Sequence, residues 1–401
     1  MSDRTRYAVG AVLAGLLVPS VVAACSWDYD TIKMERTRFP GTLELITGKF
    51  LRHSPEFYRW RIDDRLKRLE TAPSDAALLD DLAVAYDKTG RHDEAIETAR
   101  RTERLHPGRY ETAANLGTFY FHAGKFAEGL PHIDRALAIN PDAHFGRERI
   151  QKRLVEYVVS RNKAGALPLA DVTVHPPAAD DAPPPRSVRM HNTFADFLSP
   201  ESRGAFGVLD AAEAAATVKG ILGMMAFGKH DSPVLLEALG ACLSQGPDSD
   251  AADAKLLAAR AYLKASYEVP DGPARAGYRA LALHALQFQT PGRGSDAQVT
   301  IEQVEADFRK ELDEGRDWYA ALHVRELSWV RDGKNPEAEF DKLYAAEPEV
   351  TGLDVSDPMN ARDRTLLLLI ALGIILALGT AAVLAGCALL VRRHLRRRVA
   401  A

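Results

Sequence analysis

Apolar and polar side chains follow a helical period through most of the chain between residues 41 and 347. Apolar residues recur every three or four positions, for example in the segments LELITGKFLR (43–52) and PEFYRWRIDDRLKRL (55–69). The strict alternation that is typical of a half-buried strand does not persist anywhere. The pattern therefore predicts an all-α fold.

A proline-rich segment divides this helical part of the chain into two regions. Residues 174–186 read VHPPAADDAPPPR, a composition that favours an extended linker. Before the linker, residues 143–162 are predicted to form an amphipathic helix that caps the first region, 41–163. The second region, 194–347, contains further apolar-periodic segments, separated by short breaks of Gly, Pro, Asp and Ser: 211–228, 232–244, 253–269, 277–288, 299–315 and 318–333. We expect two all-α domains.

A repeat of 34 residues lies within the first region. Pro73, Pro107 and Pro141 are spaced 34 residues apart, and segments 82–99 and 116–133 share one pattern of residue types. The pattern has a small residue where two helices touch, a tyrosine that fills the space between them, and a glycine that ends the first helix in the left-handed conformation. The corresponding pairs are Ala83 and Gly117, Tyr86 and Tyr120, and Gly90 and Gly124.

This pattern resembles the tetratricopeptide repeat (TPR), a helix–turn–helix unit of 34 residues. The resemblance covers repeats 76–109 and 110–143, and residues 45–69 are then a degenerate first repeat. It implies a solenoid of helical hairpins with a concave groove that binds protein partners. Carried over position by position, the groove residues are Asp80, Val84, Asp87, Lys88, Glu111, Asn115, Thr118, Phe121 and His122.

Two details of this groove follow from the same resemblance. The family's clamp for carboxylates is absent, because Asp80 and Val84 occupy two of its positions. Phe121 has two interpretations: it faces the groove, where it contacts a peptide or helix of a partner, or it packs on the neighbouring repeat.

The N-terminus is typical of an export signal. A short basic start precedes the uncharged residues 7–24, which end in Ala23 and Ala24, as signal-peptidase cleavage requires. The tetrad Val22–Cys25 resembles a bacterial lipobox, which implies cleavage before Cys25 and acylation of its thiol. Ordinary cleavage after Ala24 and an uncleaved anchor are the alternatives.

The C-terminal part contains a second membrane signal. Residues 365–391 carry no charge and, at ~1.5 Å per residue, form a helix of about 40 Å, long enough to cross a bilayer. The tail 392–401 is rich in arginine, which places it in the cytoplasm and residues 25–364 outside. We expect a single-pass protein of the bacterial inner membrane, held there by this span and by lipid on Cys25. Ala382 and Gly386 form a small-xxx-small pair that could support a homodimer.

Composition and motifs exclude several other classes. Lys and Arg total 51 against 55 Asp and Glu, a balance that argues against nucleic-acid binding. The three cysteines form no CxxC pair, and there is no phosphate loop, GxSxG or HExxH motif. Residues 229–232 are expected to cap a helix rather than form a catalytic triad, and the aspartates of residues 248–253 lack the Gly and Glu of a calcium loop. His122, His132 and His144 lack metal-ligand spacing. We therefore predict no catalytic residue, metal or cofactor.

Three functions fit these observations. The first is a membrane-tethered scaffold that binds other proteins or peptides of the cell envelope. The second is an enzyme with an unrecognised active site in 194–347, which the missing motifs disfavour. The third is a single-span sensor, which the short tail disfavours. The sequence favours the non-enzymatic scaffold.

Overall fold

The computed structural model describes residues 28–29, 39–141, 146–161, 169, 171–172, 190–198, 211–245, 252–286 and 299–346. They belong to one compact unit, residues 1–349, and a second unit comprises residues 350–401. Within the described residues, regular structure is helical apart from one antiparallel pair of two-residue strands, β1 (Asp171–Val172) and β2 (Met190–His191). The predicted all-α fold is confirmed for this part of the chain.

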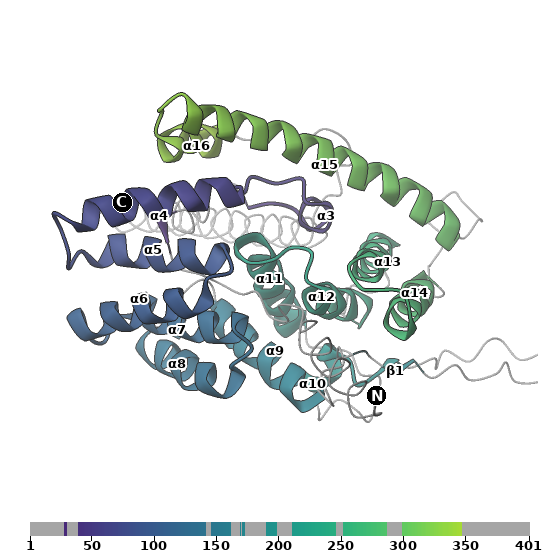
Figure 1. Cartoon of the computed structure of the whole chain (residues 1–401). Helices are drawn as coiled ribbons and strands as arrows, with labels where there is room; N and C mark the ends of the chain where they lie inside the picture. The colour runs from purple at the N-terminus through teal and green to yellow at the C-terminus, as the bar shows by residue number, and fades with distance from the viewer. Residues whose placement is uncertain are drawn as a thin grey trace, which may run out of the picture. The chain divides into compact units, whose positions relative to one another are not determined.

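The first helices form a series of hairpins in chain order (Figure 1). Each helix packs against the next: α4 (Pro55–Leu69), α5 (Ala76–Lys88), α6 (His92–Leu105), α7 (Tyr110–His122) and α8 (Phe126–Ile139). The α5/α6 hairpin lies within residues 76–109 and the α7/α8 hairpin within residues 110–143, as the 34-residue spacing predicts.

Local sequence explains the geometry of both hairpins. Asp75 caps the start of α5, because its side chain accepts hydrogen bonds from two first-turn backbone N–H groups. Gly90 and Gly124 follow the first helix of each pair with φ angles of 78° and 72°, the left-handed conformation that the sequence predicts there. A Cβ added to Gly117 would lie 2.5 Å from the side chain of Ile133. The missing side chain at Gly117 therefore lets α7 and α8 approach closely.

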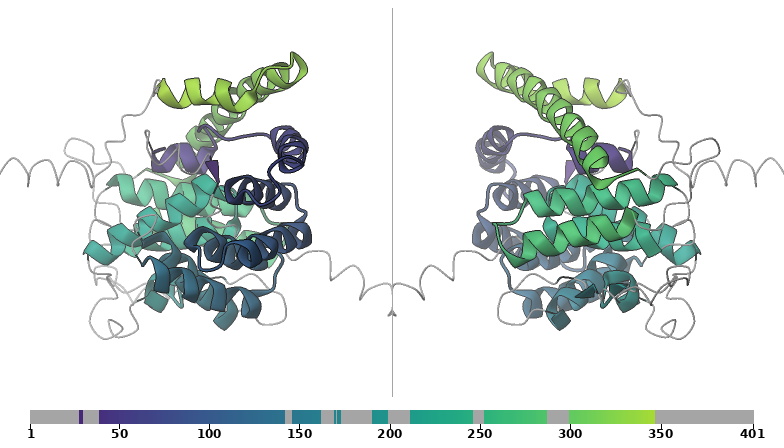
Figure 2. Two further views of the ribbon diagram at one scale, coloured as in Figure 1. Left: turned by 90° about the vertical axis from the view of Figure 1, so that its left-hand side faces the viewer. Right: turned by 90° about the vertical axis from the view of Figure 1, so that its right-hand side faces the viewer.

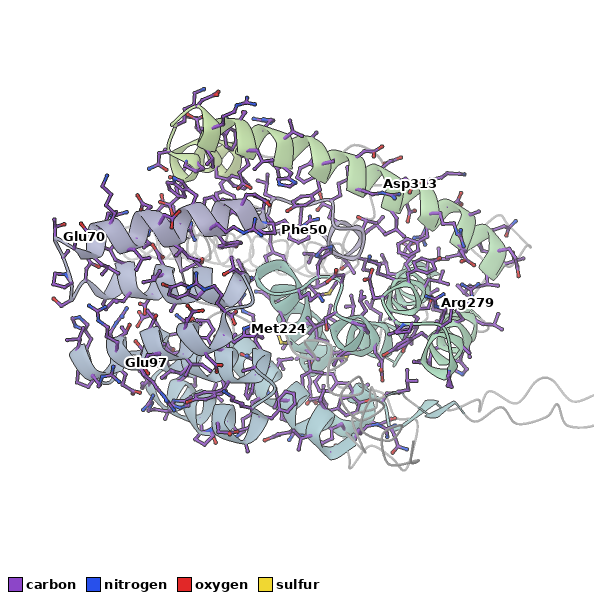
Figure 3. The ribbon with its side chains drawn as sticks, viewed as in Figure 1. Phe50, Glu70, Glu97, Met224, Arg279 and Asp313 are labelled. Atoms are coloured by element: carbon purple, nitrogen blue, oxygen red, sulfur yellow. The ribbon has the colours of Figure 1, made fainter. Side chains whose placement is uncertain are left out.

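The array of helices continues past the predicted cap. Helix α9 (Arg147–Arg161) packs on α8 and also on α11 (Ala211–Phe227), so it connects the two helical regions instead of ending the first. Helices α12 (Pro233–Gln245), α13 (Ala252–Tyr267) and α14 (Pro273–Leu286) follow, each in contact with the one before, and the short α10 (Phe194–Leu198) lies against α9 and α12. In Figure 3 Met224 lies inside the array, where it is fully buried, and Arg279 lies on the outer side of α14.

One long helix closes the array. The segments 299–315 and 318–333, predicted as separate helices, form the continuous helix α15 (Ile301–Arg331), followed by α16 (Pro336–Ala345). Gly315 lies inside α15 and does not break it; a Cβ there would lie 2.6 Å from the carbonyl oxygen of Thr47, so this glycine permits a close contact with α3. Helix α15 contacts α13 and α14 as well as α3 and α4, and runs along one edge of the array (Figures 1 and 2).

The segment before α4 does not form the expected hairpin. Helix α3 (Thr42–Thr47) is short and packs on α11, α13 and α15, whereas α4 packs on α5. Gly48 ends α3 in the left-handed conformation, and the following residues lead the chain away to α4. The interpretation of residues 45–69 as a degenerate repeat is therefore wrong in its helix pairing.

Several predictions concern residues outside the described part of the chain. These are the export signal 1–24, Cys25, the linker 174–186, the membrane span 365–391 and the tail 392–401. Among the residues that the structure does describe, none of the helices combines the length and apolar character that crossing a membrane requires.

Candidate functional site

The residues predicted to line a partner-binding groove are mostly buried. Val84, Asn115 and Thr118 have no exposed surface, and Lys88, Glu111 and His122 are half-buried. Phe121 is 1% exposed and packs on α8, where a Cβ added to Gly129 would lie 2.5 Å from its ring. For Phe121 the structure therefore shows packing within its own hairpin.

Other parts of the same chain cover these positions. The Lys88 ammonium donates a hydrogen bond to the backbone carbonyl of Phe227 at the end of α11. The Gln151 amide on α9 donates to the hydroxyl of Thr118 over 3.1 Å. The expectation of an open groove at these residues is thus corrected, because later helices of the chain pack against this face. Contact between any of these groove residues and a partner protein stays a prediction.

Asp80 shows the electrostatic effect of this burial. Its carboxylate pairs with Arg109 at 2.8 Å. Burial nevertheless raises the pKa of Asp80 to about 7, since the favourable interaction with Arg109 offsets only part of the desolvation. Asp80 is therefore a buried partner of Arg109 and does not present a charge to solvent.

The carboxylate of Asp87, at the end of α5, lies between two imidazoles. Its Oδ1 is 2.8 Å from Nδ1 of His92, the first residue of α6, and its Oδ2 is 2.6 Å from Nδ1 of His122, the last residue of α7. Burial alone would raise the pKa of Asp87, but the charge of His122 and hydrogen bonds from both rings hold it well below its usual range. The hydrogen bond to Asp87 raises the pKa of His92. The Asp87 cluster, as we call these three residues, joins the ends of three helices.

The repeat pattern in the sequence places Asp87 and His122 in the groove and assigns no role to His92. The spacing of the repeat could have identified this cluster from the sequence. Asp87 and His122 are 35 positions apart, about one repeat, so they occupy neighbouring helix ends on adjacent hairpins. His92 begins the helix that lies between them in sequence.

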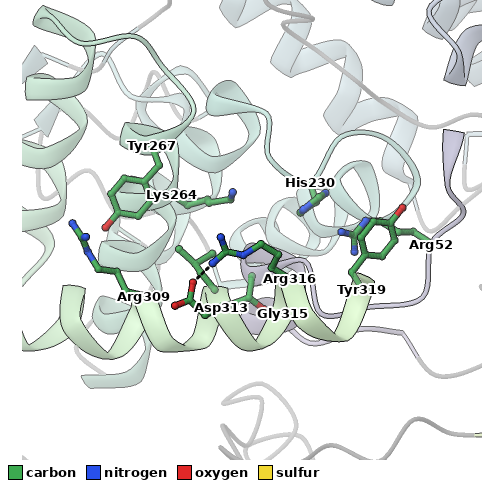
Figure 4. A pocket seen from close by; sticks show the side chains of 11 residues that line it. Arg52, His230, Lys264, Tyr267, Arg309, Asp313, Gly315, Arg316 and Tyr319 are labelled. Carbon is green, nitrogen blue, oxygen red and sulfur yellow. Dashed lines mark hydrogen bonds and ion pairs between the residues drawn. The ribbon is translucent and has the colours of Figure 1, made fainter. Parts of the chain in front are cut away.

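A pocket of about 570 Å³ opens between α3, α13 and α15 (Figure 4). Its walls come from parts of the chain that are far apart in sequence: Thr47, Arg52, His230, Lys264, Tyr267, Arg309, Leu312, Asp313, Gly315, Arg316 and Tyr319. Four of these side chains are cationic at neutral pH, and Asp313 is the acidic one. We call this the cationic pocket.

Arg52 contributes a half-buried positive charge to the cationic pocket. Its guanidinium stacks on the ring of Tyr319 at 3.5 Å and donates to the backbone carbonyls of Gly48 and Phe50. Burial lowers the pKa of Arg52 to about 10, which leaves it charged at pH 7. Burial, together with the nearby Arg52 charge, lowers the pKa of His230 to about 3, so this imidazole is neutral there.

The other cations of the pocket have acidic neighbours on their own helices. Lys264 pairs with Glu268, and Arg316 pairs with Asp313, which Figure 4 shows at the pocket wall. The side chain of Arg316 is 71% exposed and can turn toward a ligand at little cost. The pocket therefore presents one fixed and three adjustable positive charges, a suitable arrangement for an anionic group. No sequence motif identifies the cationic pocket, because α3, α13 and α15 come together only in the folded chain.

Comparison with known proteins supports the repeat. No family model matches the chain. It is similar to the small glutamine-rich tetratricopeptide repeat-containing protein 2 of Mycosarcoma maydis, with 22% identity over 153 residues. The match covers 38% of this chain and 40% of that protein, so it spans less than half of either. A relative that contains tetratricopeptide repeats and an all-helical fold of hairpins both fit a TPR-type protein.

Proposed function

We propose that the chain is a TPR-type scaffold that binds other proteins and performs no catalysis of its own. The observation that carries the proposal is the pair of hairpins α5/α6 and α7/α8, which match the 34-residue spacing of the repeat. The relative from Mycosarcoma maydis supports it by its name as a repeat-containing protein. Repeats of this kind stack into extended surfaces that are suited to protein recognition.

The surface that we assign to the partner is the cationic pocket. The face that would be the groove in a simple repeat array is covered by α9 and α11, as the bonds of Thr118 and Lys88 illustrate. The cationic pocket offers positive charge beside two tyrosine rings, Tyr267 and Tyr319. Such a combination suits an acidic peptide segment, whose carboxylates pair with arginine while its apolar parts contact the rings.

The cellular setting is also part of the proposal. The uncharged segments 7–24 and 365–391, with the arginine-rich tail, support a bacterial envelope protein that is held in the inner membrane. Cys25 would carry lipid, and residues Ala382 and Gly386 would support pairing of two spans. The partners would then be envelope proteins on the outer side of that membrane.

Site-directed photocrosslinking in the native cell tests the partner surface. A crosslinking residue replaces Asp313 in the cationic pocket, and the matched control replaces Arg331, an exposed residue at the far end of the same helix. We expect a discrete protein adduct from position 313 that Arg316→Glu weakens and Arg331→Glu leaves unchanged. Adducts from the control position alone would retain a scaffold but reject this pocket. The absence of protein adducts at both positions would count against the scaffold itself.

A further inference from the structure

We propose that the Asp87 cluster binds a divalent transition-metal ion of the zinc class. Three side chains of metal-ligating type converge from three helices: a carboxylate from α5 and imidazoles from α6 and α7. One ligand atom from each lies within 4.8 Å of the others. Ligands bound to one tetrahedral ion at ~2.0–2.2 Å lie within such a distance of one another.

The donor set indicates which ions fit. Two imidazole nitrogens and one carboxylate suit zinc and its first-row neighbours, whereas magnesium and calcium prefer sites made only of oxygen. Three protein ligands would leave a fourth position for water or for a side chain of a partner. The proposal goes beyond the scaffold function, because it gives the protein a cofactor that no motif in its sequence specifies.

Burial and access are both appropriate for a bound ion. The side chains of Asp87 and His122 are 1% and 7% exposed, whereas that of His92 is 28% exposed, so an ion would enter past His92. Both Nδ1 atoms already face the Asp87 carboxylate at hydrogen-bond distance. Metal binding displaces the ligand protons, so a divalent cation would take the place of these hydrogen bonds at the same point.

The position of the cluster gives the ion a structural role. His92 and His122 belong to successive hairpins, and Asp87 lies between them. An ion held by all three would fix the ends of α5, α6 and α7 together and stabilise the folded state by mass action. Zinc should therefore raise the melting temperature of the protein, and magnesium should not.

Metal titration of the untagged full-length protein tests the proposal. The protein is first stripped with a chelator and then titrated with Zn²⁺ against a chromophoric indicator, with Mg²⁺ as the hard-ion comparison. We expect one zinc ion per chain, bound at micromolar or lower concentration, and a higher melting temperature with zinc alone. His92→Ala and His122→Ala should each weaken zinc binding at least about tenfold, the loss that removal of a metal ligand or its support produces.

The matched control is His132→Ala, which removes a half-buried histidine that stacks on Tyr120 outside the cluster. It should leave zinc affinity unchanged. His92→Ala keeps the test decisive, because His92 is partly exposed at a helix start and its loss should not unfold the chain. Wild-type protein that binds no zinc at micromolar concentration, or zinc binding that survives in His92→Ala and His122→Ala, would overturn the proposal.

Discussion

Arg61 and Glu337 form a buried ion pair across 276 positions of sequence, with 2.8 Å between Nε and Oε1. Arg61 lies on α4 and Glu337 on α16, so the pair links the first hairpin helix to the last described helix. Arg65 also donates to Glu337, and Arg61 contacts Asp28 at 3.1 Å. Buried charged groups thus connect the two ends of the helical array, beside aromatic contacts of Phe340 with the His53 ring.

Removing Glu337 should therefore destabilise the protein strongly. Glu337→Ala leaves two buried guanidinium groups with less compensating charge, and breaking a buried pair costs ~3–5 kcal/mol. Arg61 and Arg65 retain Asp28 and Asp81, so we expect about 3 kcal/mol in the free energy of unfolding, measured by urea denaturation.

The control for this prediction is Glu339→Ala on the same helix. Glu339 pairs with the exposed Lys342 at 2.7 Å, and surface pairs of this kind add little stability. Equal urea midpoints of unfolding for the Glu337 and Glu339 variants would show that the buried pair does not stabilise the packing of α16 on α4.

Gly117→Leu should weaken the second repeat. A side chain at Gly117 meets Ile133 at 2.5 Å, and overpacking of a tight contact costs ~1–3 kcal/mol or more. The melting temperature should fall relative to the wild type. The comparison variant is Ala127→Leu, which adds the same bulk at an exposed position of α8 and should melt like the wild type. If Gly117→Leu melts like Ala127→Leu, the close contact of α7 and α8 is not essential.

The hairpins of residues 76–143 could be predicted because their geometry depends on residues that are close together in the sequence. A glycine such as Gly90 needs only its local conformation to end a helix, and Gly117 repeats the position of Ala83 one unit later. The closure by α15 depends instead on long-range contacts, such as those of His53 and Ser54 with Glu326, which carry no periodic signal. Gly315 illustrates the difference, since in sequence it is a helix breaker and in the fold it admits the carbonyl of Thr47.

The same distinction explains the site predictions. Groove positions were carried over from a simple repeat array, in which nothing covers the first helices of each pair. Here α9 and α11 lie on that face, and their register is set by contacts such as Gly220 with Ile150, where an added Cβ would lie 2.8 Å from the isoleucine. Burial of Thr118, whose hydroxyl accepts from Gln151 on α9, could therefore not be predicted from the repeat alone.

Glu305 should make stability depend on pH. Hydrogen bonds from Arg279 and Arg309, with one from Tyr267, lower the pKa of Glu305 to about 2 from 4.5. A carboxylate with a lowered folded-state pKa adds stability that is complete above the unfolded value and is lost as pH falls through the folded value. The difference in melting temperature between wild type and Glu305→Gln should thus be full at pH 7 and shrink from pH 4.5 toward pH 2.

The matched variant for Glu305 is Asp317→Asn, an exposed carboxylate further along the same helix. Its melting temperature should differ little from wild type at neutral pH. A difference for Glu305→Gln that stays constant across this pH range would mean that its ion pairs with Arg279 and Arg309 do not stabilise the fold.

The proposed membrane topology predicts the behaviour of reporter fusions. A phosphatase that is active only outside the cytoplasm should be active when fused after Pro348. The same enzyme should be silent when fused after Ala401, because the arginines of the tail keep that end in the cytoplasm. Activity at the second position and silence at the first would reverse the proposed orientation.

A lipid on Cys25 would be close in sequence to residues that the helical array holds. Asp28 and Tyr29 follow Cys25 closely, and both are attached to the helical array: Asp28 pairs with Arg61 at 3.1 Å, and the Tyr29 hydroxyl donates to Asp341 over 2.6 Å. Three residues span at most about 10 Å, so a lipid on Cys25 would keep the array close to the membrane surface rather than on a long tether. Metabolic labelling with a fatty-acid probe should mark the wild type, and Cys25→Ser should abolish the mark. Label that persists in Cys25→Ser would refute acylation at this thiol.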